Sequence, residues 1–320
     1  MWFRVTDIVN ENPRVRMDKS QISPRRAALS AAMVDAARDV ETTLGEVLPE
    51  PHGLHGRVHE AMRYATFAGG KRLRPFLVLH SARLFGVPET RARRVAAAIE
   101  VMHTYSLVHD DLPCMDDDDL RRGRPTTHKA FDEATAVLAG DALLTISFEI
   151  LADPATHESG DVRCRLIARL AEAAGSNGMI GGQMIDMQAP SNAFNPGDVI
   201  HLQRLKTGAL FEYACEAGAI LAEVGQKEQE RLRHYARDLG LAFQIADDLL
   251  DVTGTTEQLG KTAGKDVEQG KATLVSVYGV DGARAEATKL AASAAALLES
   301  FGEKASLLRE LPYFMVERDS

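Results

Sequence analysis

The segment Leu241–Gly254 reads LAFQIADDLLDVTG and combines a helical pattern with a stripe of polar side chains. Its polar residues at i, i+3, i+4 and i+7 share one helix face, namely Gln244, Asp247, Asp248 and Asp251. The positions between them are apolar, which indicates a helix that is buried around most of its circumference. Buried carboxylates are costly unless they are paired or bind a metal. The segment therefore predicts a core helix that carries a charged site, and a solvent-facing stripe is the less favoured alternative.

The same helical spacing continues along most of the chain. From Ala27 onward Ala and Leu dominate, and apolar positions recur every three or four residues. There is no alternating strand pattern and no internal repeat of 20–50 residues. We therefore expect a polar arm at 1–26 and one all-α domain of about ten long helices at 27–320. The expected helices cover about residues 27–46, 53–67, 74–86, 90–111, 129–151, 161–175, 177–188, 197–219, 226–253, 281–300 and 303–318.

Composition excludes several classes of protein. The 320 residues carry a net charge of -9, whereas a general nucleic-acid binder usually has a basic face. The three cysteines, Cys114, Cys164 and Cys215, form no C-x-x-C pair, which suits a reducing compartment. No segment resembles a signal peptide, and no run of ~18 apolar residues occurs. These features predict a cytoplasmic protein without stable membrane insertion.

A second acidic segment precedes the first by about 130 residues. His109–Pro125 reads HDDLPCMDDDDLRRGRP, with six aspartates followed by three arginines. Helical spacing places His103, Ser106 and Asp110 on one face, and the chain then turns at Leu112-Pro113 toward Asp116. The run lacks the glycine that an EF-hand loop needs at its sixth position. Asp117–Asp119 can also be read as a solvated charge run.

Two acidic clusters on separate helices suggest a facing pair of carboxylate sets. Oxygen-only ligands favour Mg²⁺, Mn²⁺ or Ca²⁺ over zinc. Mg²⁺ is commonly held by a few carboxylates, water and substrate phosphates. Arginine binds phosphate in a bidentate manner, which gives Arg121, Arg122 and Arg124 a purpose beside the aspartates. The sequence therefore predicts a site for a metal and a phosphorylated substrate.

Further cations occur beside glycines. Lys71, Arg72 and Arg74 follow Gly69-Gly70 at the approach to a helix, where backbone N–H groups favour anions. The segment RLKTG places Lys206 and Thr207 before Gly208 inside a helical pattern, which indicates a kink. The long irregular segment Thr253–Lys271 suggests a lid. It contains Lys261, Lys265 and Lys271. Each of these cations taken alone is more often a solvated surface charge.

Six motifs together carry a family resemblance. GGKRLRP, HDDLPCMDDDDLRRGRPTTH, GGQMIDM, KTG, FQIADDLLDV and GKTAGKD occur in this order between Ala27 and the end of the chain. In this order and spacing they resemble the short-chain trans-polyprenyl diphosphate synthases, above all the bacterial farnesyl diphosphate synthases. The four residues between Asp111 and Asp116 are similar to the bacterial and plastid branch.

The resemblance implies an isoprenoid-synthase type of fold, in which a helix bundle surrounds a central cavity and the two aspartate motifs face each other. It implies three Mg²⁺ ions, with Mn²⁺ as a possible substitute, held by Asp110, Asp111, Asp116, Asp247, Asp248 and Asp251. It places the allylic diphosphate on Arg121, Lys206, Lys261 and Lys271, and isopentenyl diphosphate on Lys71, Arg74, His103 and Arg122. It places Thr207 and Gln244 near the developing cation and, with Lys206, among the catalytic residues.

The implied activity is that of a prenyltransferase. Isopentenyl diphosphate would condense head to tail with dimethylallyl or geranyl diphosphate, through an allylic carbocation, to give farnesyl diphosphate and free diphosphate. The resemblance also implies a homodimer and chain-length control at the positions five and four residues before the first aspartate, Tyr105 and Ser106. The less favoured alternative is that Tyr105 is only a core aromatic.

Other functions fit less well. A geranylgeranyl diphosphate synthase of the same family is the nearest alternative, because sequence does not settle product length. A non-catalytic subunit of a heteromeric prenyl synthase usually lacks an aspartate motif, and both are intact here. Class I terpene cyclases normally carry Asn, Ser and Glu ligands in the second motif, unlike DDLLD. An acidic metal-buffering protein would have no use for the arginines.

Overall fold

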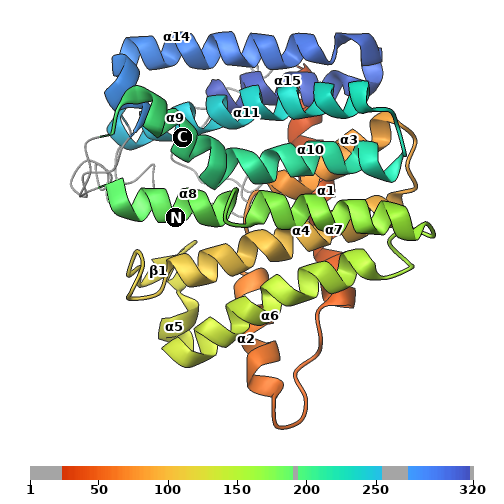
Figure 1. Ribbon diagram of the computed structural model, residues 1–320, viewed down its shortest axis with the longest axis vertical. Coiled ribbons are helices and arrows are strands. Elements are labelled where there is room, and N and C mark those ends of the chain that lie inside the picture. The colour runs from red at the N-terminus through yellow and green to blue at the C-terminus, as the bar shows by residue number, and fades with distance from the viewer. Residues whose placement is uncertain (1–23, 190–193, 254–272, 318–320) are drawn as a thin grey trace.

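Helices make up nearly all of the regular structure in the computed structural model, which describes residues 24–189, 194–253 and 273–317. The predicted all-α class is confirmed. In Figure 1 the helices α14, α11, α10, α4 and α6 follow one another from top to bottom as roughly parallel layers. The elements are α1 (Pro24–Val47), α2 (Gly56–Thr66), α3 (Leu73–Leu84), α4 (Glu89–Asp110), β1 (Leu120–Arg121), β2 (Arg124–Pro125), α5 (Thr127–Ala130), α6 (Glu133–Ala152), α7 (Gly160–Ala174), α8 (Met179–Gln188), α9 (Pro196–Gln203), η4 (Arg204–Gly208), α10 (Ala209–Leu221), α11 (Gln226–Thr253), α14 (Leu274–Leu297), η5 (Glu299–Ala305) and α15 (Ser306–Val316).

The core is built around α3, α4 and α10. Ten of the twelve residues of α3 and all but the first residue of α10 are buried, so these helices are apolar on nearly every face. Gly218 lets α10 approach α3 closely, because a Cβ atom there would lie 2.3 Å from the backbone nitrogen of Ala82. The core helices are therefore held by close backbone contact as well as by side-chain packing.

Local signals explain several helix ends. α9 begins at Pro196 after Asn195, whose side chain accepts from the backbone N–H of Asp198 while Asp198 returns the bond, which makes a capping box. Asn followed by Pro is a sequence signal for a helix start, and it agrees with the expected start at about residue 197. α6 begins after Asp132, which accepts from Thr135 N.

Three features depart from the expected helices. Leu120–Pro125 forms a small antiparallel hairpin, with Arg122 (φ 54°) and Gly123 (φ 73°) in its turn. Two-residue strands are too short to show an alternating pattern. α14 begins at Leu274 rather than near 281. Gly279 (φ 66°) interrupts the helical backbone, so the helical pattern in the sequence is recognisable only after it. The expected helix at 197–219 is divided into α9, η4 and α10.

The kink predicted at KTG is a π-helical turn, η4. Such turns inside helices frequently occur at functional sites. The carboxyl ends of α4 and α11, the hairpin and η4 all lie at one end of the bundle, at the left in Figure 1. This end therefore gathers the two aspartate motifs and KTG.

The predicted N-terminal arm overlaps the first helix. α1 begins at Pro24, so residues 24–26 of the predicted arm form its first turn. The rest of the arm and the expected lid, with Lys261, Lys265 and Lys271, lie outside the described residues.

Among the described helices, α6 alone matches a membrane-crossing helix by length and composition. It packs on α2, α4 and α7, and core helices of soluble proteins pass the same test.

Candidate active site

The first acidic cluster is formed by a chain reversal at the end of α4. The backbone N–H of Asp116 donates to the carbonyl of Asp110 at 2.9 Å, so the five intervening residues fold back on the helix end. Burial raises the pKa of Asp110 to about 6, and the charge of Asp116 acts in the same direction, while Lys206 opposes it. The two carboxylates therefore lie close enough to repel each other.

Asp111 faces a different partner. It is 3 % exposed, and both Nε and Nη2 of Arg121 lie 2.6 Å from its Oδ1. Burial nevertheless raises the pKa of Asp111 to about 6, against the effect of Arg121. Arg121 also lies 3.6 Å from Asp118. The arginine is thus oriented by two carboxylates at the edge of the cluster.

Lys206 of η4 lies within electrostatic reach of the first cluster. Its Nζ donates to Oδ2 of Asp186 at 2.5 Å. Burial lowers the pKa of Lys206, but the charges of Asp186, Asp110 and Asp116 outweigh it, so the pKa is raised. The ammonium group is therefore held charged between Asp186 and the aspartates at the end of α4.

Gly182 explains how Asp186 reaches Lys206. A Cβ atom on Gly182 would lie 2.3 Å from the backbone nitrogen and 2.6 Å from Cα of Lys206, so only glycine permits α8 to touch η4 here. Asp186 follows four residues later on the same helix face. The GGQMIDM motif thus has a physical reason, although sequence reasoning assigned no role to Asp186.

The second cluster is joined to η4 through Thr207. Thr207 Oγ1 donates to Gln244 Oε1 at 3.2 Å, and Gln244 Nε2 donates to Asp248 Oδ1 at 2.9 Å. Asp248 Oδ2 accepts from the backbone N–H of Leu274 at 2.6 Å, which anchors the start of α14. Two consecutive residues of η4 are therefore linked to different clusters. Lys206 feels the charges of Asp110 and Asp116, and Thr207 is joined to Asp248 through Gln244.

The three aspartates of the second acidic cluster have different surroundings. Asp248 and Asp251 are each 4 % exposed, whereas Asp247 is half-buried. Asp247 is thus the most exposed of the three carboxylates and the best placed to meet an incoming ligand.

A group of cations surrounds His103. Burial lowers the pKa of His103 well below its usual value, and the nearby charges of Arg74, Arg122, Arg121 and Arg72 act in the same direction. The imidazole is therefore neutral at pH 7. Burial also lowers the pKa of Arg74 and of Arg122 to about 10 each. Cations gathered this closely are suited to a multiply charged anion.

The Gly69-Gly70 pair receives Arg122. The guanidinium donates to the carbonyl of Gly69, and a Cβ atom on Gly70 would lie 2.7 Å from its central carbon. Gly70 also has φ 134°, which favours glycine. The two glycines of GGKRLRP thus make room for an arginine that lies far along the chain.

Arg72 and Glu100 form a buried ion pair beneath the cations. Arg72 Nη1 donates to Glu100 Oε1 at 2.6 Å and Nη2 donates to the carbonyl of Thr66 at 2.7 Å. Both residues are 2 % exposed. Sequence reasoning did not single out Glu100, although it is the one acid in the apolar run VAAAIEVM. Arg72 therefore holds the loop before α3 rather than facing a substrate.

The two proposed chain-length residues are buried in α4. Tyr105 is 5 % exposed, and its hydroxyl is buried without a hydrogen-bond partner. Burial raises the pKa of Tyr105 to about 12, and the charge of Asp110 contributes. Ser106 is 9 % exposed and its hydroxyl donates to the carbonyl of His103 at 2.8 Å. Tyr105 thus lies near the first acidic cluster.

Two cations lie apart from these groups. Arg124 stacks over the ring of Tyr64, with 4.4 Å between the guanidinium carbon and the ring centre. Lys71 is exposed at the approach to α3. Lys261 and Lys271 cannot be placed because they lie outside the described residues.

The donor set is compatible with Mg²⁺, although it is sparse. Within residues 24–189, 194–253 and 273–317, no three carboxylate, imidazole or thiol groups converge closely enough to hold a metal ion by themselves. Mg²⁺ usually keeps several waters and combines one or two carboxylates with substrate phosphates. Asp110 and Asp116 on one side, with Asp247 on the other, offer oxygen donors of this kind.

Comparison with known proteins identifies the family. The polyprenyl synthetase family profile matches residues 55–311. The chain is 40 % identical over 292 residues to a farnesyl diphosphate synthase from Bacillus subtilis (strain 168), covering 91 % of this chain and 98 % of the relative. It is 45 % identical over 297 residues to the chloroplastic geranylgeranyl pyrophosphate synthase 11 of Arabidopsis thaliana, covering 90 % and 80 % respectively.

Solved structures agree with the sequence comparison. A crystal structure of an FPP/GFPP synthase from Zymomonas mobilis, without ligand, superposes with a TM-score of 0.82 at 46 % identity and covers 91 % of this chain and 99 % of that chain. A geranyltransferase from Legionella pneumophila superposes with a TM-score of 0.81 at 32 % identity, with 91 % and 97 % covered. The chain therefore belongs to the polyprenyl synthetase family and is a prenyltransferase.

Proposed function

We propose that this prenyltransferase condenses isopentenyl diphosphate with dimethylallyl or geranyl diphosphate to form farnesyl diphosphate. The observation that supports it most is the position of η4, where Lys206 feels the charges of Asp110 and Asp116 and Thr207 reaches the second acidic cluster through Gln244. This arrangement brings anion-binding, metal-binding and dipolar groups to one end of the bundle.

The allylic diphosphate would lie between the acidic clusters. Bound Mg²⁺, three ions by analogy with the family, would supply Lewis-acid stabilisation of the leaving diphosphate. Asp110, Asp116 and Asp247 are the proposed principal ligands, with Asp111, Asp248 and Asp251 in support. Lys206 would neutralise charge as the carbon–oxygen bond breaks. Arg121 would turn from Asp111 toward the diphosphate, and Lys261 and Lys271 are proposed to join it.

Isopentenyl diphosphate would bind on the cations around His103. Arg74 and Arg122 would take its phosphate oxygens, with Lys71 at the exposed edge. His103 stays neutral and can donate one hydrogen bond without adding to the repulsion among the arginines. Thr207 and Gln244 would direct their oxygen dipoles at the allylic cation, and the surrounding apolar helices would exclude water from it.

Tyr105 supports a fifteen-carbon product. Its ring lies in α4 five residues before Asp110, and its hydroxyl is buried without a partner, as expected for a side chain that faces an apolar channel. The relatives include both farnesyl and geranylgeranyl synthases at similar identity, so a twenty-carbon product is the second candidate.

Product analysis tests this proposal. Purified protein would be given Mg²⁺, isopentenyl diphosphate and each allylic primer in turn, and the dephosphorylated alcohols separated by chromatography. Tyr105→Ala should shift the product from fifteen toward twenty carbons, whereas Tyr105→Phe keeps the ring and should not. Wild type that makes only the twenty-carbon product would favour the second candidate. Wild type inactive with every primer, yet metal-bound and folded, would indicate a non-catalytic subunit.

Assembly and location are proposed on separate observations. Val137 and Leu138 on α6, and Ile180, Met184 and Met187 on α8, expose 40–59 % of their surface. Large exposed apolar groups favour a protein partner, and we propose a second copy of this chain. Cys114 and Cys164 are exposed and unpaired, which suits the cytoplasm.

A further inference from the structure

A second cleft lies beside η4, outside the candidate active site. It has a volume of about 400 Å³. Arg204 and Leu205 of η4 line it, whereas the next two residues of the same turn bond elsewhere, Lys206 to Asp186 and Thr207 to Gln244. The remaining lining residues come from α7, α10, α11 and the turn before α8. The cleft and the candidate active site thus share one π-helical turn.

The lining of the cleft is rich in arginine. Four arginines, Arg169, Arg204, Arg233 and Arg237, line it with two glutamates, Glu172 and Glu212. Two further glutamates pair with these arginines from outside the lining, Glu216 with Arg169 and Arg233, and Glu230 with Arg233. The arginines come from three separate elements, so the fold gathers them. Arginine is the residue best suited to planar, bidentate binding of phosphate groups.

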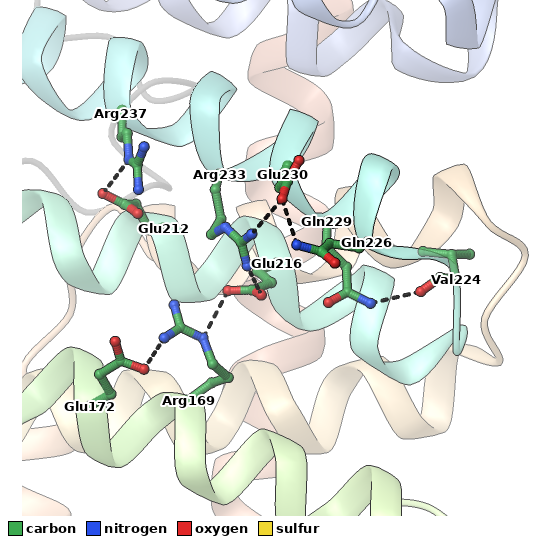
Figure 2. A network of polar contacts seen from close by, with 10 residues as sticks. All are labelled: Arg169, Glu172, Glu212, Glu216, Val224, Gln226, Gln229, Glu230, Arg233 and Arg237. Atoms are coloured by element: carbon green, nitrogen blue, oxygen red, sulfur yellow. Dashed lines mark hydrogen bonds and ion pairs between the residues drawn. The ribbon is translucent and has the colours of Figure 1, made fainter.

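Two of these arginines are held in place by one buried glutamate. Figure 2 shows Glu216 between Arg169 and Arg233, with Arg169 Nε at 3.0 Å and Arg233 Nη1 at 2.6 Å from its carboxylate oxygens. Glu216 is only 1 % exposed and does not line the cleft. Each guanidinium has five N–H donors, so these contacts fix the two groups while leaving donors for a ligand.

Arg204 is the least compensated charge. Its side chain is 56 % exposed, and its nearest carboxylate oxygen, Oε1 of Glu212, is 3.8 Å away. The same oxygen lies 3.0 Å from Nε of Arg237, as Figure 2 shows for that pair. One glutamate is therefore shared by two arginines, and Arg204 makes no close hydrogen bond to it.

We propose that this cleft binds a small polyphosphate anion, of the class of inorganic diphosphate, at a site distinct from the catalytic one. Its apolar lining is limited to Ala173, Leu205 and Ala209, which gives a prenyl chain no channel. Because Arg204 and Leu205 share η4 with Lys206, the bound anion acts on the turn that positions Lys206. The inference goes beyond the proposed function, since it concerns a second binding site.

The test is calorimetric titration of the full chain with inorganic diphosphate in EDTA, without metal or prenyl substrate. Arg204→Gln should raise the Kd by about tenfold, because one charge-assisted contact is lost. Glu172→Gln removes a carboxylate from the lining and should lower the Kd. Arg38→Gln on α1 is the matched control, because Arg38 is 69 % exposed and lies outside the cleft. It should leave the Kd unchanged.

Two outcomes would overturn the proposal. Equal Kd values for wild type, Arg204→Gln and Glu172→Gln, with all three folded by circular dichroism, would show that the cleft does not bind the anion. Loss of binding in Arg121→Gln but not in Arg204→Gln would place the anion in the candidate active site instead. Neither outcome bears on prenyl transfer, because no substrate is present.

Discussion

At the scale of single residues, Asp186 governs the charge of Lys206. Among the carboxylates that raise the pKa of Lys206 against burial, Asp186 has the largest effect. The side chains of Asp186 and Lys206 are only 12 % and 27 % exposed, respectively. Asp186→Asn should lower kcat/KM for the allylic substrate about tenfold or more, because the ammonium group loses its partner. It should also move the alkaline limb of the activity profile to lower pH, since the lysine pKa falls.

Steady-state kinetics over pH would measure both effects. Asp161→Asn, at an exposed position in the first turn of α7, is the control for loss of a carboxylate. A merely structural role of Asp186 would lower stability and leave the alkaline limb where it is.

His80 makes a separate prediction about pH and stability. It is 6 % exposed and stacks on Phe76, with 4.1 Å between the ring centres. Burial and the charge of Arg83 lower its pKa to about 3, so the folded protein keeps this imidazole neutral well below pH 7. In the unfolded chain a histidine has pKa ~6.5. Below that pH the unfolded state binds a proton that the folded state does not, so the free energy of unfolding falls as pH falls.

Through this effect His80 lowers the free energy of unfolding by about 2 kcal/mol between pH 7 and pH 5. His80→Gln should therefore reduce the drop in the free energy of unfolding between pH 7 and pH 5 by about that amount. Urea unfolding of both proteins at the two pH values measures it. An identical drop in wild type and variant would contradict the role of His80.

Much of the candidate site could be inferred at the residue scale, but not the partners of its charges. Helical spacing was enough to group Gln244, Asp247, Asp248 and Asp251, because period 3.6 is a local property. The contacts of Asp186 with Lys206, and of Glu100 with Arg72, join segments 20 and 28 residues apart. Such pairing depends on how helices pack, which no local pattern records.

At the scale of elements, the contact between α8 and η4 depends on Gly182. Gly182→Ala places a Cβ atom 2.3 Å from the backbone nitrogen of Lys206, and backbone cannot move aside cheaply. The variant should lose ~1–3 kcal/mol of stability. It should also lose activity, because α8 must withdraw Asp186 from Lys206.

Gly45→Ala in α1 is the matched control for Gly182→Ala. No atom lies within 4 Å of a Cβ atom at Gly45, so the change should stabilise the protein by up to ~1 kcal/mol through helix propensity. Thermal unfolding and the prenyl-transfer rate would be compared for both variants. A Gly182→Ala protein as stable and active as Gly45→Ala would show that α8 and η4 do not need this contact.

Element boundaries followed from the sequence where capping or glycine signals were strong. Asn195-Pro196 and Gly208 predicted the start of α9 and the irregular turn η4. The first turn of α14 was missed because Gly279 interrupts the pattern, and its start is fixed by the distant Asp248 through Leu274. The hairpin was missed because its pairing is only two residues long.

At the scale of the whole molecule, the proposed dimer surface belongs to helices that hold the candidate site. α6 carries Gly140, where a Cβ atom would lie 2.0 Å from Nε2 of His109, the residue before Asp110. The same Nε2 lies 3.0 Å from the carbonyl of Val137. α8 carries Asp186. A partner that packs on α6 and α8 would therefore steady both sides of the first acidic cluster.

Charge placed on this surface should separate the protomers. The double variant Leu138→Glu and Met184→Glu replaces side chains that are 59 % and 56 % exposed, so the fold of one protomer has little reason to change. In a dimer, the same glutamates would be buried without partners, at a cost of several kcal/mol. Sedimentation velocity should show a dimer for wild type and a monomer for the variant, with a lower rate of prenyl transfer.

Leu54→Glu is the matched control, because Leu54 is fully exposed in the loop before α2 and the change should leave the dimer intact. A double variant that stays dimeric would place the interface on another face, and a wild type that is monomeric at all concentrations would remove the link between assembly and the candidate site.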